Sequence, residues 1–171
     1  MNPPECSCLH CGTPVPPDRS RFCCAGCEHV FRLLTEGGLQ DFYKLRGGST
    51  LAPVPPQALR ERDWQWLEEL AARAETQAGE NTSAQLDLAV QGLSCLGCVW
   101  LIESVFKTLP GAQRIEIQPA RGLLRVTWHR GAFTFTDFAR SVQQFGYLLG
   151  TPGAAPAGDV FSLGRRTGVC A

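Results

Sequence analysis

The sequence lacks a surplus of charge of either sign, a long apolar run and a secretory leader. Lys plus Arg and Asp plus Glu both number 16, whereas proteins that bind nucleic acid usually carry a basic excess. The longest apolar stretch, LGCVWLI, ends at Glu103 and is far shorter than the roughly 20 residues of a membrane span. The N-terminus MNPPECSCLH lacks the basic start and apolar core of a signal peptide. We therefore expect a soluble, cytoplasmic chain that does not bind nucleic acid.

Cysteine is abundant instead, with nine copies in 171 residues. Reducing compartments keep thiols free, so clustered cysteines in a cytoplasmic protein point to metal or redox chemistry rather than to structural crosslinks. A long cysteine-free stretch separates two groups, which predicts two separate sites. The first group comprises Cys6, Cys8, Cys11, Cys23, Cys24 and Cys27, the second comprises Cys95 and Cys98, and Cys170 stands alone near the end.

Composition and periodicity divide the chain into four parts. Cys27, Val30 and Leu34 have the spacing of one helix face, and Phe42 belongs to a second short helical pattern. Glycine and proline mark GGSTLAPVPPQ as a linker, and an apolar stripe predicts a helix over residues 58–78. The predicted parts are a Cys-rich metal-binding module at 1–46, a linker and helix at 47–83, a ferredoxin-like domain at 84–150 and a tail at 151–171.

Residues 84–150 show strand and helix patterns in the order βαββαβ, which is the ferredoxin-like arrangement. Thr134, with Asp137 three residues later, resembles a capping box at the start of the second helix. The predicted fold class is α+β: a ferredoxin-like βαββαβ domain preceded by a small Cys-rich, zinc-finger-like module with short helices. The strands are expected around Leu88, Ile115, Val126 and 147–150, and the helices after Cys98 and Thr134.

Cys95 and Cys98 form a CxxC motif between the first predicted strand and the first predicted helix of this domain. A helix N-terminus stabilises negative charge, so at least one of the two thiols should have a lowered pKa. Two thiolates without nitrogen or oxygen partners suit a soft ion, and Cu(I) is the leading candidate. A thiol–disulfide redox pair is the main alternative, and an inert pair is the third. The placement favours metal, because a thioredoxin-type motif usually has an aromatic residue before it and a proline inside it.

The N-terminal cysteines form two knuckle-like pairs separated by eleven residues. Four sulfurs from two such pairs can surround Zn(II) tetrahedrally in a closed structural site. The apolar core of about 46 residues is small, so metal binding would supply folding energy of the order of 10 kcal/mol. A zinc-ribbon adaptor for protein contacts is the alternative function. The expected ligands are Cys8, Cys11, Cys24 and Cys27, with Cys23 as a substitute and Cys6 as an extra, while His10 and His29 are expected to be ordinary polar side chains.

Several segments resemble a known family. GLSCLGCVWLIE, TLPGA, RIEIQPARGLLRVTW and FGY are similar to the heavy-metal-associated domain of copper P-type ATPases. VWLIE resembles the branch of these pumps that supplies copper for cytochrome oxidase assembly. FCCAGCEHVFRLL with GLQDFYKLR resembles the Cys-rich module that precedes the copper domain in the same branch. Taken together, the chain resembles the cytosolic N-terminal region of a bacterial copper pump.

The resemblance implies that Cys95 and Cys98 bind Cu(I) from a copper chaperone or another donor, and pass it on or sense it. Leu93 stands where the family commonly has methionine at a packing position, and Tyr147 falls where the pumps have an aromatic residue near the metal loop. The other partners would be the membrane and ATPase parts of a parent pump, with this region on the cytoplasmic face of the membrane. The ending SLGRRTGVCA resembles the approach to the first membrane helix. The DKTGT, TGE and intramembrane cysteine motifs of the family do not occur in these residues, so this chain is not expected to be an enzyme.

Overall fold

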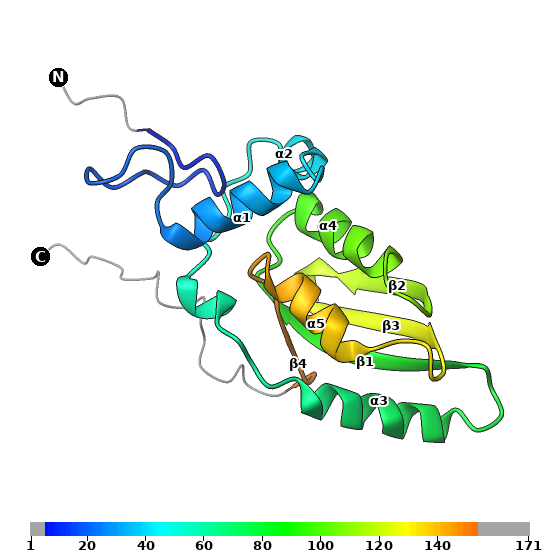
Figure 1. Cartoon of the computed structure of the whole chain (residues 1–171). Helices are drawn as coiled ribbons and strands as arrows, with labels where there is room; N and C mark the ends of the chain where they lie inside the picture. The colour runs from blue at the N-terminus through cyan, green and yellow to red at the C-terminus, as the bar shows by residue number, and fades with distance from the viewer. Residues whose placement is uncertain (1–5, 154–171) are drawn as a thin grey trace, which may run out of the picture.

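A four-stranded antiparallel sheet forms the centre of the second half of the chain (Figure 1). The structure is a computed structural model that describes residues 6–153, so the prediction for most of the tail lies outside the described residues. The strand order is β2-β3-β1-β4, with β1 paired to β3 on one side and to β4 on the other. The strands are β1 at Ser83–Gln91, β2 at Ala112–Gln118, β3 at Leu123–His129 and β4 at Leu148–Gly150.

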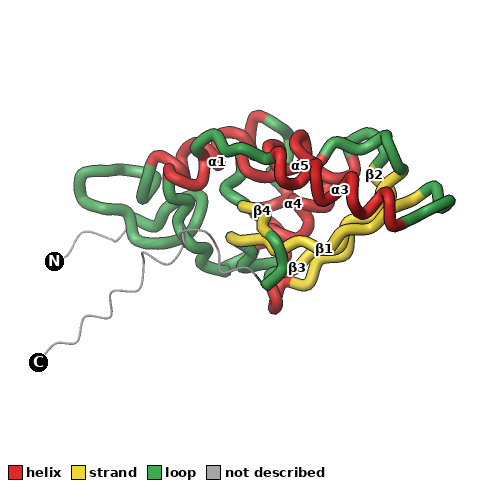
Figure 2. The backbone as a smooth tube through the Cα atoms, turned by 90° about the horizontal axis from the view of Figure 1, so that it is seen from below, coloured by secondary structure: helices red, strands yellow, loops and turns green. Residues whose placement is uncertain are grey.

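Two helices, α4 (Leu96–Lys107) and α5 (Phe135–Gln143), pack beside each other on this sheet. Figure 2 shows the helices on one side and the strands on the other. Between the layers, Trp128 is fully buried and meets the ring of Phe135 edge-to-face, with 4.8 Å between the ring centroids. The order βαββαβ and the antiparallel sheet confirm the predicted ferredoxin-like α+β fold.

The Cys-rich module consists of a looped segment followed by α1 (Ala25–Glu36) and α2 (Asp41–Arg46). An isolated bridge between Ser7 and Pro14 closes the first loop. Val30 and Leu34, on the apolar stripe of α1, are buried. Both short helices lie where the sequence pattern predicts them.

The segment between the two units differs from its prediction. The expected helix over 58–78 starts only at α3 (Gln65–Gln77), after a single 3-10 turn, η1 (Pro56–Leu59). The carbonyl oxygens of Ala58 and Arg60 both accept hydrogen bonds from Nε2 of the buried Gln143, at 3.0 and 2.5 Å. Because a side chain of α5 satisfies these carbonyls, residues 60–64 stay non-helical. The proline-rich stretch before them is also packed rather than free, since Leu51 and Val54 are buried in it.

Helix α3 packs against β1 and α5 and supplies two carboxylates to the domain. Glu68 Oε1 accepts the backbone N–H of Thr136 at 2.7 Å, which satisfies a donor in the first turn of α5. The Thr134 side chain makes no capping hydrogen bond, so the predicted capping box does not form. Glu75 Oε1 accepts the indole N–H of Trp128 at 2.8 Å. Among the helices of residues 6–153, none has the length and apolar character needed to cross a membrane.

Replacing Gln143 by leucine should destabilise the protein by about 1–3 kcal/mol, because buried polar groups then lose their partners. Gln143 Oε1 also accepts the indole N–H of Trp64 at 3.2 Å, so three groups are affected. Urea unfolding followed by tryptophan fluorescence measures the change. Gln144→Leu is the matched control, since Gln144 is exposed and its replacement should change stability by less than about 0.5 kcal/mol.

Candidate metal sites

The CxxC loop joins the end of β1 to the start of α4. Gly92 has φ +94, a left-handed conformation that glycine adopts without strain, and it turns the chain out of the strand. Cys95 is then the N-cap of α4, and Cys98 lies in its first turn. Their Sγ atoms are 3.4 Å apart, so the structure brings the predicted pair together. Cys98 is only 2% exposed, whereas Cys95 is half-buried.

The surroundings of the two thiols differ. Burial by itself raises the pKa of Cys98, but the Tyr147 hydroxyl and the neighbouring Ser94 outweigh it, and the resulting pKa lies below that of an ordinary thiol. Burial raises the pKa of Cys95. Tyr147 is buried with its hydroxyl beside Cys98, and both burial and the nearby sulfur raise the pKa of Tyr147. Cys98 is therefore the thiolate-prone member of the pair, and Tyr147 lines the same small cavity.

A second group of sulfurs lies in the Cys-rich module, where four Sγ atoms are all within 4.8 Å of one another. The Sγ atom of Cys23 is 3.5 Å from that of Cys11 and 3.5 Å from that of Cys27. Sulfurs bound tetrahedrally to zinc at about 2.3 Å lie about 3.8 Å apart, so the observed spacing fits such an ion. Three of the four side chains are buried, as in a closed structural site. The group consists of Cys8, Cys11, Cys23 and Cys27.

Cys23, rather than Cys24, joins this sulfur cluster. Cys24 is the N-cap of α1, where its Sγ accepts the N–H of Cys27 at 3.4 Å and donates to the carbonyl oxygen of Val54 at 3.2 Å. The geometry thus corrects the predicted choice of Cys24 with Cys23 as substitute. CCxxC spacing cannot decide between adjacent cysteines, because the cap conformation of the backbone sets which sulfur faces inward. Cys6 is exposed and lies outside the cluster.

The thiols of this cluster differ in their pKa values. A hydrogen bond with Cys27 is the main cause that lowers the pKa of Cys11 to about 4. The same contact, followed by one with Cys24, raises the pKa of Cys27, because its proton is held between neighbouring sulfurs. Burial raises the pKa of Cys23 to about 12. Four adjacent thiolates repel one another, so a bound divalent cation is what would allow all four to lose their protons.

His10 lies beside the cluster but outside the group of four. It is 3% exposed, and its ring stacks on Phe42 with centroids 5.9 Å apart. Its Nδ1 is 3.1 Å from the hydroxyl oxygen of Tyr43. Burial lowers the pKa of His10 to about 4, so the ring is neutral at physiological pH. His29 also lies outside the group of four sulfurs.

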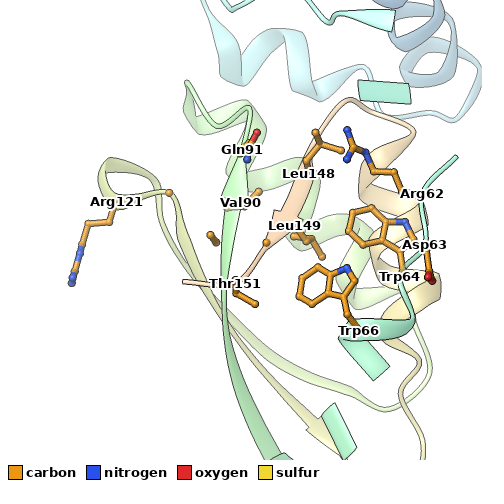
Figure 3. Close-up of a pocket in the computed structure, with 13 residues that line it drawn as sticks. Arg62, Asp63, Trp64, Trp66, Val90, Gln91, Arg121, Leu148, Leu149 and Thr151 are labelled. Atoms are coloured by element: carbon orange, nitrogen blue, oxygen red, sulfur yellow. The ribbon is translucent and has the colours of Figure 1, made fainter. Parts of the chain in front are cut away.

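A separate hollow of about 580 Å³ lies where the start of α3 faces the short edge strand β4. Figure 3 shows the indole rings of Trp64 and Trp66 facing Leu149, while Arg121 points away. None of the side chains that line this hollow belongs to a cysteine or a histidine. Soft metals prefer sulfur and imidazole ligands, so this hollow is not a metal site of the kind formed by the two sulfur groups.

Comparisons with known proteins identify two consecutive domains. Residues 7–76 match the family described as "Putative metal-binding domain of cation transport ATPase". Residues 87–147 match the heavy-metal-associated domain family. The first match includes the sulfur cluster and continues to the end of α3, and the second includes the CxxC loop. A search of the curated proteins found no match.

Solved structures resemble the second domain. The "putative copper-ion-binding protein from Bacillus anthracis str. Ames" is 36% identical, with 41% of this chain and 99% of that chain covered and a TM-score of 0.38. The N-terminal domain of a "Potential Copper-translocating P-type ATPase from Bacillus subtilis" is 19% identical over 44% and 94% of the two chains, with a TM-score of 0.39. The copper chaperone of Enterococcus hirae is 24% identical over 39% and 97%, with a TM-score of 0.35.

The fold, the CxxC loop and the family matches define residues 87–147 as a metal-binding domain. The chain belongs to the heavy-metal-associated domain family and, ahead of that domain, matches the putative metal-binding domain of cation transport ATPases. The predicted resemblance to the N-terminal metal-binding region of a cation ATPase is thereby confirmed.

Zinc retention should distinguish the two adjacent cysteines of the cluster. Cys23→Ser should leave the purified protein with much less than one zinc per chain, because it removes one of four clustered sulfurs. Cys24→Ser should keep its zinc, since serine is itself a good N-cap. Elemental analysis of the purified proteins, with far-UV circular dichroism to check folding, measures the difference. Zinc loss from Cys24→Ser but not from Cys23→Ser would contradict the observed geometry.

Proposed function

We propose that this chain is the metal-binding N-terminal region of a copper-translocating P-type ATPase, and that its CxxC loop accepts Cu(I) and passes it on or senses it. The observation that carries the proposal is the pair of sulfurs of Cys95 and Cys98, 3.4 Å apart at the open N-terminus of α4. The chain then acts by binding metal rather than by catalysis.

The chemistry of the pair favours a soft, monovalent ion. Thiolates are soft ligands, and only sulfur is offered at this loop apart from the Ser94 hydroxyl, 3.8 Å from Cys98 Sγ. The positive end of the α4 dipole stabilises the negative charge that two thiolates bring to one cation. A two-coordinate ion leaves room for a third sulfur, so a donor can hand over Cu(I) by exchanging one thiolate at a time. A copper chaperone or another Cu(I) donor would be the partner.

The N-terminal sulfur cluster has a different role in this proposal. Its buried sulfurs and tetrahedral spacing suit a resident Zn(II) ion, held by Cys8, Cys11, Cys23 and Cys27. Zinc has no redox chemistry of its own, so the ion would hold the loop and the two short helices together. The module would then be folded only when its metal is bound.

The membrane and ATPase parts of the parent pump would be the permanent partners of this region, on the cytoplasmic face of the membrane. The segment VWLIE that follows Cys98 supports the cytochrome-oxidase-assembly branch within this proposal. A redox role for the CxxC pair competes with metal transfer, because the same two sulfurs could form a disulfide. Copper binding separates the two functions.

Replacing either cysteine of the CxxC loop by serine should weaken Cu(I) binding by more than about 100-fold, since loss of a residue that only orients a metal ligand already costs about 10–100-fold. Competition with a chromophoric Cu(I) chelator, under reducing conditions and with one equivalent of zinc preloaded, measures this affinity. Cys6→Ser is the matched control, because Cys6 is exposed and outside both sulfur groups. Cu(I) affinity that stays unchanged in Cys95→Ser and Cys98→Ser would refute copper transfer at this loop.

A further inference from the structure

The Cys-rich module lies against the CxxC loop of the second domain, with α2 directly beside the first turn of α4 (Figure 1). A Cβ atom added at Gly97 would lie 2.8 Å from the carbonyl oxygen of Phe42 and 3.3 Å from the backbone nitrogen of Arg46. Only glycine allows α2 to approach this closely. The three nearest atoms all belong to α2, so this glycine serves the contact between the modules.

This contact covers one side of the CxxC loop and leaves the other side open. Leu96, at the tip of the loop, is 73% exposed, whereas Cys98 is 2% exposed. A small cavity of about 20 Å³ separates Cys98 and Tyr147 from His10 and Phe42 of the Cys-rich module. That space holds about one water molecule, so no partner side chain can reach Cys98 through it. Cys95, which is half-buried, remains the accessible sulfur.

Val54 connects the covered loop to the sulfur cluster. Its backbone N–H donates to Cys27 Sγ at 3.3 Å, and its carbonyl oxygen accepts from Cys24 Sγ at 3.2 Å. Its side chain packs on Gly146, where an added Cβ would lie 2.8 Å from Val54 Cγ1. Gly146 precedes Tyr147, whose hydroxyl is beside Cys98. Val54 therefore contacts the cysteines of the module through its backbone, and Gly146, near the CxxC loop, through its side chain.

We propose that the Cys-rich module covers Cys98 and one side of the CxxC loop, so that a metal donor reaches only Cys95, and that a cation in the sulfur cluster holds the module there. The four sulfurs fix the ends of the module, α2 covers Gly97, and Val54 fills the space beside Tyr147. With the cluster loaded, a donor reaches Cys95 but not Cys98. Complete transfer onto both sulfurs then requires α2 to move away from α4.

This inference rests on the proposed function only in naming the cargo, because its structural part concerns access to Cys98. Access can be measured without copper. The experiment uses the full chain in a Cys95→Ser background, so that Cys98 is the only thiol of tryptic peptide 74–107. The zinc-loaded protein is treated with iodoacetamide, and mass spectrometry follows the alkylation of that peptide over time.

Gly97→Ala in this background should speed alkylation of Cys98 by roughly tenfold or more, because an overpacked contact shifts a docking equilibrium by this order. Alanine is a better helix former than glycine, so α4 itself should be preserved. Gly48→Ala is the matched control, since a Cβ there meets no atom within 4 Å. Removal of the cluster's ion by Cys23→Ser should also speed alkylation of Cys98.

An unchanged alkylation rate in Gly97→Ala, with its circular dichroism spectrum intact, would overturn the covering role of α2. Acceleration in Gly97→Ala but not in Cys23→Ser would overturn the link to the sulfur cluster. Neither result depends on copper affinity, so each is distinguishable from failure of the copper-binding experiment. Acceleration in both variants, with none in Gly48→Ala, supports the proposal.

Discussion

The close approach of four cysteine sulfurs, three of them on buried side chains, is the constraint on which the first half of the structure depends. Cys8, Cys11, Cys23 and Cys27 come from two loops and the start of α1, and their sulfurs meet where these segments converge. Without a cation they must share protons, and the opposite shifts of the pKa values of Cys11 and Cys27 express that conflict. Under the proposed function, a bound cation would relieve this conflict and so help to hold the module together.

The second half of the structure has a core that its own side chains fill. Its sheet is closed on one face by α4 and α5, its core is filled by aromatic rings, and α3 satisfies polar groups at its edge through Glu68 and Glu75. The loop with Cys95 and Cys98 projects from this frame at the end of the central strand. In the proposed function, the packed sheet and helices would stay unchanged while an ion binds to the CxxC loop and leaves it.

Much of this arrangement could be predicted from the sequence, because short-range patterns determine it. Alternation in β1, the helix stripe after Cys98 and the glycine turns give the βαββαβ order directly. The CxxC pair is equally local, since three residues in a first helical turn bring two sulfurs together. What the sequence could not predict depends on distant contacts. Gln143 stops the helix expected at residue 58, and Glu68 takes the place of the local cap at Thr134.

The choice between Cys23 and Cys24 failed for a related reason. The two residues are adjacent cysteines, so residue type and spacing do not distinguish them. The difference is that Cys24 Sγ accepts a hydrogen bond from the backbone N–H of Cys27 and donates one to the carbonyl oxygen of Val54, thirty residues away. The contact between the two modules could not be predicted either, because nothing in the sequence around Gly97 indicates which element packs against it. Only the structure places α2 beside this glycine.

The register of the sheet shows which side chains lie at each end of the domain. Trp128 pairs with Ala84 at the beginning of β1, so the ring cluster of Trp128, Phe133 and Phe135 lies at the end opposite to the loop after Gln91. The three-residue strand β4 holds the loop end, pairing there with residues 89–91. A change in the distance between the two sulfurs of the CxxC loop would therefore act on this short edge strand before it reached the ring cluster at the opposite end.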